Sequence, residues 1–385
     1  MKMKNIIYTL LSLVALLPVV LTSCDEAETG IVYKEINCPT DAIKWGSDVS
    51  AADKEVIAQL VNNLVKVEAC DFYMGVQSST SRREGYMSGF QYRDTIWCLI
   101  DTNNAYYVNR SKRDTVWYDA KHYVFADTIK NKHGRYPYTL VYKNNGGYKL
   151  GPVVKTSMPD YYIGKYEITQ SEWMAVMHRE PKGKYCIIGD LSGQASWYEQ
   201  IGKGDRVAAY NIWYEDAVEF CQTLSRKTGL NFRLPTEAEW ECAARGGKYT
   251  RGYKYAGSDT PGQVAWMASN ARSQGLGAED YGVHAGGEQM PNELGIYDMS
   301  GNVSEWVANA YYEYSVIDNK NPQGRPVVSV ESDTLVLRGG SWMQEKVMDF
   351  CLANRKHCVM SSYETEQSKQ SAFVNCGFRI AVSLQ

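Results

Sequence analysis

Apolar residues recur at helical spacing in two stretches of the chain. Ser50 is a candidate N-cap, and the Val, Ile and Leu residues between 56 and 65 form one apolar face behind it. Ala217, Phe220, Cys221 and Leu224 follow the i, i+3, i+4, i+7 pattern, and a glycine at 229 supplies a stop. We expect a helix in each stretch.

Two further helices are indicated by their first residues. Thr169 with Glu172, and Thr236 with Glu239, have the spacing of a capping box, in which each side chain satisfies a backbone N–H of the other residue. We expect Glu239 and the neighbouring glutamates at 237 and 241 to serve capping and solvation. Beyond residue 247 periodic segments are few, and Gly/Asn-rich loops dominate.

Strand patterns occupy the intervening part of the chain. Cys70–Gly75 reads as a strand that ends in a glycine turn. The segment Ser79–Leu150 is rich in Tyr, Trp and Thr, and runs such as Arg113–Tyr118 and Tyr138–Tyr142 predict antiparallel strands. Its aromatic residues suit either a binding surface, because they offer rigid contact area, or the small core of a thin sheet.

The first 24 residues have the features of a targeting segment. Lys2 and Lys4 precede the apolar run Ile6–Val20, which is shorter than the roughly 20 residues of a transmembrane helix. The run ends in L-T-S-C, which resembles a bacterial lipobox and predicts cleavage before Cys24 and acylation of that residue. The alternative is an ordinary signal peptide with a chance cysteine.

Residues 25–49 are interpreted as a tether. Their acidic start, Asp25–Glu28, resembles the export signal that takes lipoproteins of Bacteroidetes-type bacteria to the cell surface, although a solvated tether has the same composition. We therefore expect an outer-membrane lipoprotein in the cell envelope, facing either the surface or the periplasm, and held to the membrane by its lipid.

Composition limits the classes of partner and fold. The formal net charge is −3 and no Lys/Arg-rich run occurs, so the sequence disfavours nucleic-acid binding. About 360 residues remain after the targeting segment, more than the roughly 250–300 over which one core usually grows. One decorated domain and two small domains both fit that length.

The chain has 10 cysteines, so nine remain if Cys24 is acylated, and at least one of them stays a thiol or pairs elsewhere. None is spaced as C-x-x-C, which argues against a structural zinc site. Cys221 and Cys242 lie on expected helix faces and are predicted to be buried small hydrophobes.

Five motifs in a fixed order carry a family resemblance. They are Y-I-G-K-Y-E-I-T-Q (162–170), F-R-L-P-T-E-A-E-W-E (232–241), G-I-Y-D-M-S-G-N-V-S-E-W (295–306), L-V-L-R-G-G-S-W-M (335–343) and G-F-R-I-A (377–381). Together they resemble the formylglycine-generating enzyme, or sulfatase-modifying factor, family.

The resemblance implies an α+β, C-type-lectin-like, loop-rich fold over residues 50–385. Cys70–Gly75 resembles the family's opening strand, and Pro152–Tyr162 the second one. In compact family members little separates them, so residues at about 79–150 are interpreted as a β-rich insertion.

The segment 295–306 resembles the family's calcium loop. Carried over residue by residue, the ligands are Asp298, the carbonyls of Gly301 and Val303, and Glu305. Carboxylates mixed with carbonyls suit calcium, a hard cation. The alternative is a loop closed by hydrogen bonds alone. A second calcium loop would start at Asn270 and Ala271, but no convincing aspartate partner is evident.

The family's enzymes bind copper through two cysteines after G-G-S and oxidise a sulfatase cysteine to formylglycine. Here Gln344 stands at the first position, and Cys351 matches the second only if two residues are inserted; without them Asp349 falls there. Ser341 remains in place. Soft thiolates select Cu(I), so the loss of one makes copper unlikely. Cys358 is a remote candidate for a replacement sulfur.

We interpret the chain as a non-catalytic envelope module that binds a protein, peptide or glycan partner. The main rival is an active copper-dependent formylglycine-generating oxidase. An iron-dependent oxidase is a third class, disfavoured because the five histidines form no H-x-x-H pair.

Overall fold

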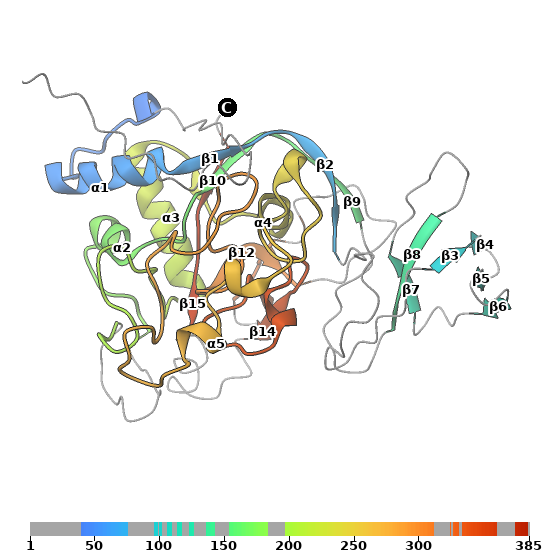
Figure 1. Ribbon diagram of the computed structural model, residues 1–385. Coiled ribbons are helices and arrows are strands. Elements are labelled where there is room, and N and C mark those ends of the chain that lie inside the picture. Colours follow the sequence, from blue (N-terminus) through green and yellow to red (C-terminus); the bar gives the residue numbers. More distant parts are fainter. Residues whose placement is uncertain are drawn as a thin grey trace, which may run out of the picture. The chain divides into compact units, whose positions relative to one another are not determined.

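The computed structural model describes residues 40–75, 154–183, 197–311, 333–359 and 374–383, parts of 324–330, and six strands between residues 96 and 142 (Figure 1). The lipobox cysteine Cys24 and most of the expected tether lie outside the described residues. Glu35–Gln385 group into one unit, which favours a single decorated domain over two small ones. No helix among the described residues is long and apolar enough to span a bilayer.

Helices form where their caps were expected. Ser50 accepts a hydrogen bond from the backbone N–H of Asp53, and both predicted capping boxes, at Thr169 and Thr236, are present. Gly229 ends the longest helix in a left-handed conformation. The helices are α1 (Ala51–Asn62), α2 (Gln170–Met177), α3 (Tyr214–Thr228), α4 (Glu237–Ala244) and α5 (Ala268–Ala271), with 3₁₀ turns η2 (Thr40–Ala42), η3 (Gly247–Tyr249), η4 (Pro261–Gln263) and η5 (Val347–Phe350).

The apolar run after Ser50 is divided between a helix and a strand. The helix α1 stops at Asn62, and Leu64–Val67 forms β1, which pairs with Tyr161–Gly164 (β10). The sequence prediction of one helical face through Val65 was therefore wrong at its end. Leu64 and Val67 are buried by sheet pairing with a segment almost 100 residues away, which local periodicity does not report.

Residues 40–49 pack on the domain. The backbone N–H groups of Lys44 and Gly46 donate to carbonyls of Thr228 and Lys227 at 2.7 and 2.9 Å, and Trp45 packs against the core. The packed chain thus begins before Ser50, so the expected tether is shorter than residues 25–49.

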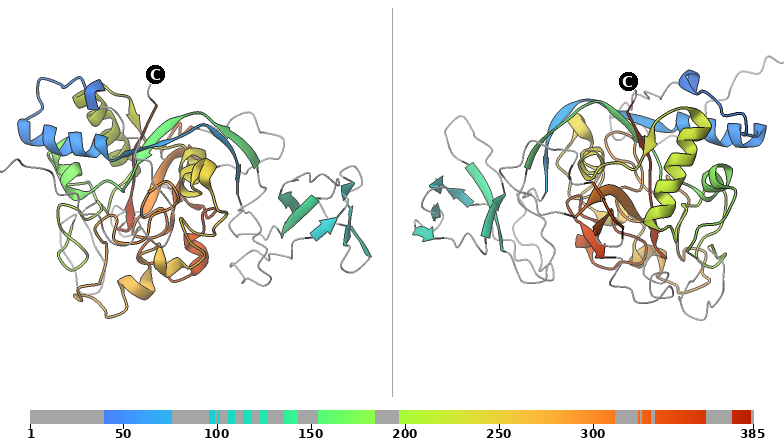
Figure 2. Two further views of the ribbon diagram at one scale, coloured as in Figure 1. Left: turned by 45° about the horizontal axis from the view of Figure 1, so that its top comes forward. Right: turned by 180° about the vertical axis from the view of Figure 1, so that it is seen from behind.

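Two four-stranded sheets organise the domain. One has the order β1-β10-β16-β11 and the other β14-β13-β12-β15. Figures 1 and 2 show β1–β2 and β9–β10 running alongside each other as one curved ribbon. The strands are β2 (Cys70–Met74), β9 (Val154–Met158), β11 (Phe232–Arg233), β12 (Ser304–Ala310), β13 (Thr334–Arg338), β14 (Lys356–Val359), β15 (Cys376–Gly377) and β16 (Ala381–Val382).

The Tyr-rich segment forms antiparallel strands, as predicted. Two three-stranded sheets have the orders β3-β8-β7 and β4-β5-β6. Their strands are β3 (Ile96–Cys98), β4 (Ile100–Asp101), β5 (Tyr106–Asn109), β6 (Asp114–Trp117), β7 (Tyr123–Ala126) and β8 (Tyr136–Tyr142). We call residues 79–150 the β insertion; β2 leads into it and β9 follows it.

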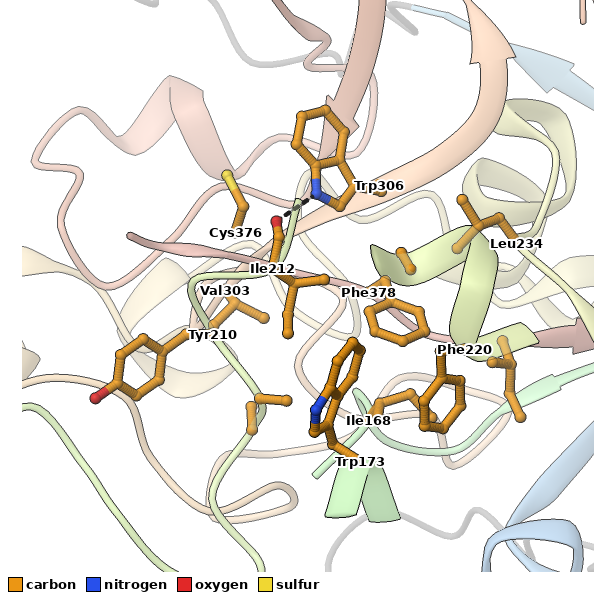
Figure 3. Close-up of a cluster of buried hydrophobic side chains, with 14 of the residues drawn as sticks. Ile168, Trp173, Tyr210, Ile212, Phe220, Leu234, Val303, Trp306, Cys376 and Phe378 are labelled. Atoms are coloured by element: carbon orange, nitrogen blue, oxygen red, sulfur yellow. Dashed lines mark hydrogen bonds between the residues drawn. The ribbon is translucent and has the colours of Figure 1, made fainter. Parts of the chain in front are cut away.

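The largest apolar cluster joins α2 and α3 to both sheets. Trp173, Phe220 and Phe378 pack ring against ring with centroids 5.2–6.3 Å apart, and the buried Trp306 donates its indole N–H to the carbonyl of Ile212 at 2.9 Å (Figure 3). The α+β class is confirmed, whereas the C-type-lectin-like description stays a prediction.

Candidate functional site

The three glutamates of α4 are buried, with 0–1 % of each residue exposed. Glu239 closes the capping box and also receives both terminal nitrogens of Arg233 at 2.6 and 2.7 Å. The capping role of Glu239 is therefore confirmed, but the expected solvation of the glutamates was wrong. Each has an arginine partner, and two of these arginines come from distant parts of the chain.

Glu237 and Glu241 fix the segment that carries the candidate copper position. Arg355 donates to both carboxylate oxygens of Glu237 at 2.5 and 2.7 Å. Arg338, at the end of β13, donates to Glu241 and to the carbonyls of Asn354 and Leu352. Because buried charges are stable only when paired, these contacts hold residues 338–355 on α4.

The G-G-S-W motif forms a closed turn. Gly339 and Gly340 have φ of 87° and 78°, which favour glycine. The Ser341 N–H donates to Oε1 of Gln344 at 2.6 Å, and the Gln344 N–H donates back to the Ser341 carbonyl at 3.0 Å. Asn375 donates its amide to the Ser341 hydroxyl at 2.5 Å. The side chain of Gln344, which the motif resemblance aligns with the family's first cysteine, therefore closes this turn.

The two candidate sulfurs, those of Cys351 and the remote candidate Cys358, pack in different apolar clusters. Cys351 is a half-buried thiol that packs beside a small apolar cluster containing Phe350. Cys358 lies on β14 and, like Cys376, is buried in the main core cluster instead. Burial raises the pKa of both core thiols to about 12, which opposes the thiolate form that Cu(I) requires. The residues present do not fit a two-thiolate copper site.

The expected calcium loop has the sharp backbone that its sequence predicted. Asp298, Gly301 and Asn302 have φ of 59°, 91° and 53°, and a side chain at position 301 would meet the Trp266 carbonyl at 2.4 Å. Asp298 accepts a hydrogen bond from the Gly287 N–H at 2.9 Å through Oδ2, while its buried Oδ1 has no hydrogen-bond partner. Burial raises the pKa of Asp298 to about 6. One ligand oxygen is thus available.

Glu305, the other proposed carboxylate ligand, is already paired. Arg379 donates to both its oxygens at 2.7 and 2.8 Å, and the Trp240 indole N–H donates to one of them at 2.9 Å. The fit to calcium is therefore uneven: Asp298 offers an oxygen, whereas Glu305 neutralises an arginine. Among the described residues, no group of three or more His, Cys, Asp or Glu is placed to hold a metal ion. The calcium site stays a prediction.

Sequence reasoning missed two residues that complete this region. Glu167 accepts hydrogen bonds from the Val303 N–H at 3.0 Å and from the Asn302 amide at 2.6 Å. Burial, with the charges of Asp298 and Glu305 nearby, raises the pKa of Glu167 well above its usual range. Glu167 and Arg379 both lie inside the recognised motifs, so the sequence could have drawn attention to these residues. It could not show that the motifs contact each other.

The weaker upstream loop stays a prediction, and Asp280 is the aspartate that lies near it. Asp280 has a buried Oδ1 without a hydrogen-bond partner, and the Gly282 N–H donates to the Ala271 carbonyl at 2.9 Å. Asn270, however, uses its amide group on the Met267 N–H and the Ala265 carbonyl. The predicted start of the loop is therefore engaged in closing its own turn.

Comparison with known proteins agrees with these motifs. Residues 116–384 match the sulfatase-modifying factor enzyme 1-like domain. The chain is 36 % identical over 178 residues to the chaperone protein LppX of Paenibacillus barcinonensis, covering 39 % of this chain and 62 % of LppX. It is 30 % identical over 200 residues to the inactive C-alpha-formylglycine-generating enzyme 2 of Mus musculus, covering 49 % and 56 %.

The chain thus spans about 56–62 % of the length of these two relatives. Among solved structures, PvdO from Pseudomonas aeruginosa superposes with a TM-score of 0.52 at 19 % identity, covering 83 % of this chain and 94 % of PvdO, which supports a shared fold. Because the family model covers more than half of the chain, the protein belongs to the sulfatase-modifying factor, or formylglycine-generating enzyme, family.

Proposed function

We propose that the protein is a non-catalytic member of its family, which acts as a binding or structural module in the cell envelope. The observation that carries this proposal is the position of Gln344. Its side chain closes the turn at Ser341 with a 2.6 Å hydrogen bond, where a copper enzyme of the family would place a thiolate. An amide oxygen is a hard ligand and does not replace sulfur on Cu(I).

Other residues of the loop make ion-pair and packing contacts. Arg338 and Arg355 are neutralised by buried glutamates, and Trp342 is fully buried against Tyr281. Such contacts stabilise the fold whether or not a metal binds nearby. The similarity to a protein named an inactive formylglycine-generating enzyme, and to one named a chaperone, supports a role without oxidation chemistry.

The rival function is copper-dependent formation of formylglycine, and the thiol of Cys351 supports it. The purified protein, incubated with copper and a peptide containing Cys-x-Pro-x-Arg, separates the two. We expect no aldehyde product by mass spectrometry. Copper-dependent conversion of the peptide cysteine to formylglycine would establish the enzyme instead.

We further propose that Cys24 anchors the protein to the outer membrane. The support is the L-T-S-C motif after a basic and apolar start. Cys24→Ala should move the protein from the membrane fraction to the soluble fraction. Retention of C24A in the membrane after high-salt washing would contradict the anchor. Protease treatment of intact cells tests surface exposure separately, since only a surface-facing protein is cleaved.

The partner is proposed to be a protein, peptide or glycan of the envelope. The resemblance interprets the β insertion as an addition to a compact family member, and its described residues form six strands. Affinity capture from native envelopes should compare the full chain with a variant in which residues 79–150 are replaced by a short Gly/Ser linker. Loss of the captured species with a folded variant assigns binding to the insertion, and equal capture assigns it to the rest of the domain.

A further inference from the structure

Two cysteines meet where β2 passes over α4. Cys70 begins β2, Cys242 lies in α4, and their Sγ atoms are 3.6 Å apart although 172 residues separate them in sequence. A disulfide has an S–S distance of about 2.05 Å, so the sulfurs need to approach by about 1.5 Å to form the bond. We propose that Cys70 and Cys242 form a disulfide that ties the root of the β insertion to α4.

The two thiols differ in a way that assigns their roles. Cys70 is partly exposed, whereas Cys242 is fully buried in the second apolar cluster. The pKa of Cys70 is lowered because its sulfur shares a hydrogen bond with Cys242, and Lys248 adds a favourable positive charge. The same hydrogen bond raises the pKa of Cys242, and burial raises it further. Cys70 is thus the nucleophile that an external oxidant reaches.

The oxidation balances as a thiol–disulfide exchange with a disulfide-bearing oxidant. The thiolate of Cys70 attacks one sulfur of the oxidant, which forms a mixed disulfide and releases one thiolate. Cys242 then loses its proton and attacks Sγ of Cys70, which releases the second thiolate. Two electrons pass to the oxidant, and its two leaving thiolates take up the two protons.

The far end of β2 is already attached to α4 by hydrogen bonds, and the disulfide would attach the near end as well. The Gly75 N–H donates to Glu241 at 2.7 Å, and Arg245 donates to the Gly75 carbonyl at 2.6 Å. Glu241 also binds Arg338, which begins the G-G-S-W turn. A disulfide at Cys70 would therefore fix both ends of β2 to the helix that supports the candidate site.

The test uses the whole chain and oxidised glutathione as the probe. Reduced protein is incubated with oxidised glutathione, quenched in acid, alkylated, and digested for mass spectrometry. We expect one cross-linked peptide pair that contains Cys70 and Cys242, absent from Cys70→Ser and still present in Cys351→Ser. Alkylation of both cysteines in the unmutated protein, or a bond from Cys70 to a different cysteine, would overturn the proposal.

A second measurement follows the consequence for the fold. Amide hydrogen exchange should be slower in β2 for the oxidised protein than for the reduced one, and the melting temperature should rise by several degrees, since the bond closes a long loop. The Cys70→Ser variant should show neither change. Exchange and melting that are identical in the bonded and reduced forms would show that the bond does not fasten β2.

Discussion

The expected calcium loop (295–306) and the turn that follows β13 (338–351) meet on one sheet, since Glu305 of β12 lies opposite Arg338 of β13. Both are held by buried arginine–glutamate pairs, through Arg379 in the first and Arg338 in the second. They differ in the contacts of the residues that the family resemblance assigns to ligand positions. Asp298 has a buried oxygen without a hydrogen-bond partner, whereas Gln344 accepts a hydrogen bond that closes the turn.

That difference separates the residues that hold the fold from the residues that could take part in metal chemistry. In both loops, glycines with positive φ close the turns and a tryptophan is buried in the core. Two of the positions that the resemblance assigns to ligands also hold the fold, since Glu305 pairs with Arg379 and Gln344 closes the turn at Ser341. A family motif in this chain therefore predicts structure more strongly than it predicts activity.

The largest effect is expected from removing a scaffold charge. Glu241→Ala leaves Arg338 and Arg245 without their shared carboxylate in a buried site, and should lower the free energy of unfolding by about 3–5 kcal/mol. Glu219→Ala, which removes a partly exposed partner of Arg179, should cost about 1 kcal/mol or less. Urea unfolding of both variants compares them, and equal losses would refute the scaffold role.

A second prediction concerns calcium at Asp298. If the ion binds the folded protein, a 100-fold excess over its dissociation constant stabilises by roughly 2.7 kcal/mol. Asp298→Asn should abolish that gain, while Glu288→Gln, a partly exposed acid near the same loop, should keep it. The readout is the melting temperature with calcium and with a chelator. No difference in the unmutated protein would remove calcium from both loops.

The pH dependence of this gain follows from the raised pKa of Asp298. A buried carboxyl with a folded pKa of about 6 holds its proton more firmly in the folded state than in the unfolded state. Without the ion, its ionisation therefore costs stability as pH rises from about 4 to 6. Calcium should offset this cost above pH 6 and lose its effect as pH falls below 6. A calcium gain that does not depend on pH would argue against Asp298 as the ligand.

The smallest effect is expected at the cap of α4. Thr236→Ala removes the side-chain acceptor for the Glu239 N–H, and should cost about 1 kcal/mol. Thr260 precedes a 3₁₀ turn without making a side-chain cap bond, so Thr260→Ala is the matched control and should change stability by only a few tenths of a kcal/mol. Equal unfolding midpoints for the two variants would show that the capping box is dispensable.

The sequence predicted what depends on near neighbours. The capping boxes at Thr169 and Thr236 and the glycine stop at 229 involve residues within one helical turn, and all three are present. The burial of Glu237 was not predictable in this way, because its partner Arg355 lies 118 residues farther along the chain. The spacing of the three glutamates in α4 is by itself typical of a solvated helix.

For the candidate site, the sequence likewise predicted the residues but not their contacts with distant parts of the chain. The family motifs placed Asp298, Glu305 and Gln344, but they did not show that Arg379 occupies both oxygens of Glu305. That pairing brings together two motifs 74 residues apart. The role of Gln344 as the acceptor for the Ser341 N–H likewise needs the turn geometry, which the motif does not state.

A competition titration against a Cu(I) chelator tests the central claim most directly. The unmutated protein should fail to take Cu(I) from the chelator, because Gln344 supplies no thiolate at the position that the resemblance aligns with the first copper-binding cysteine. Comparing the Cu(I) affinity of Gln344→Cys with that of Gln344→Ser tests whether a second sulfur is sufficient to create the site. Tight stoichiometric Cu(I) binding by the unmutated protein, abolished by Cys351→Ser, would contradict the account and identify an active copper site.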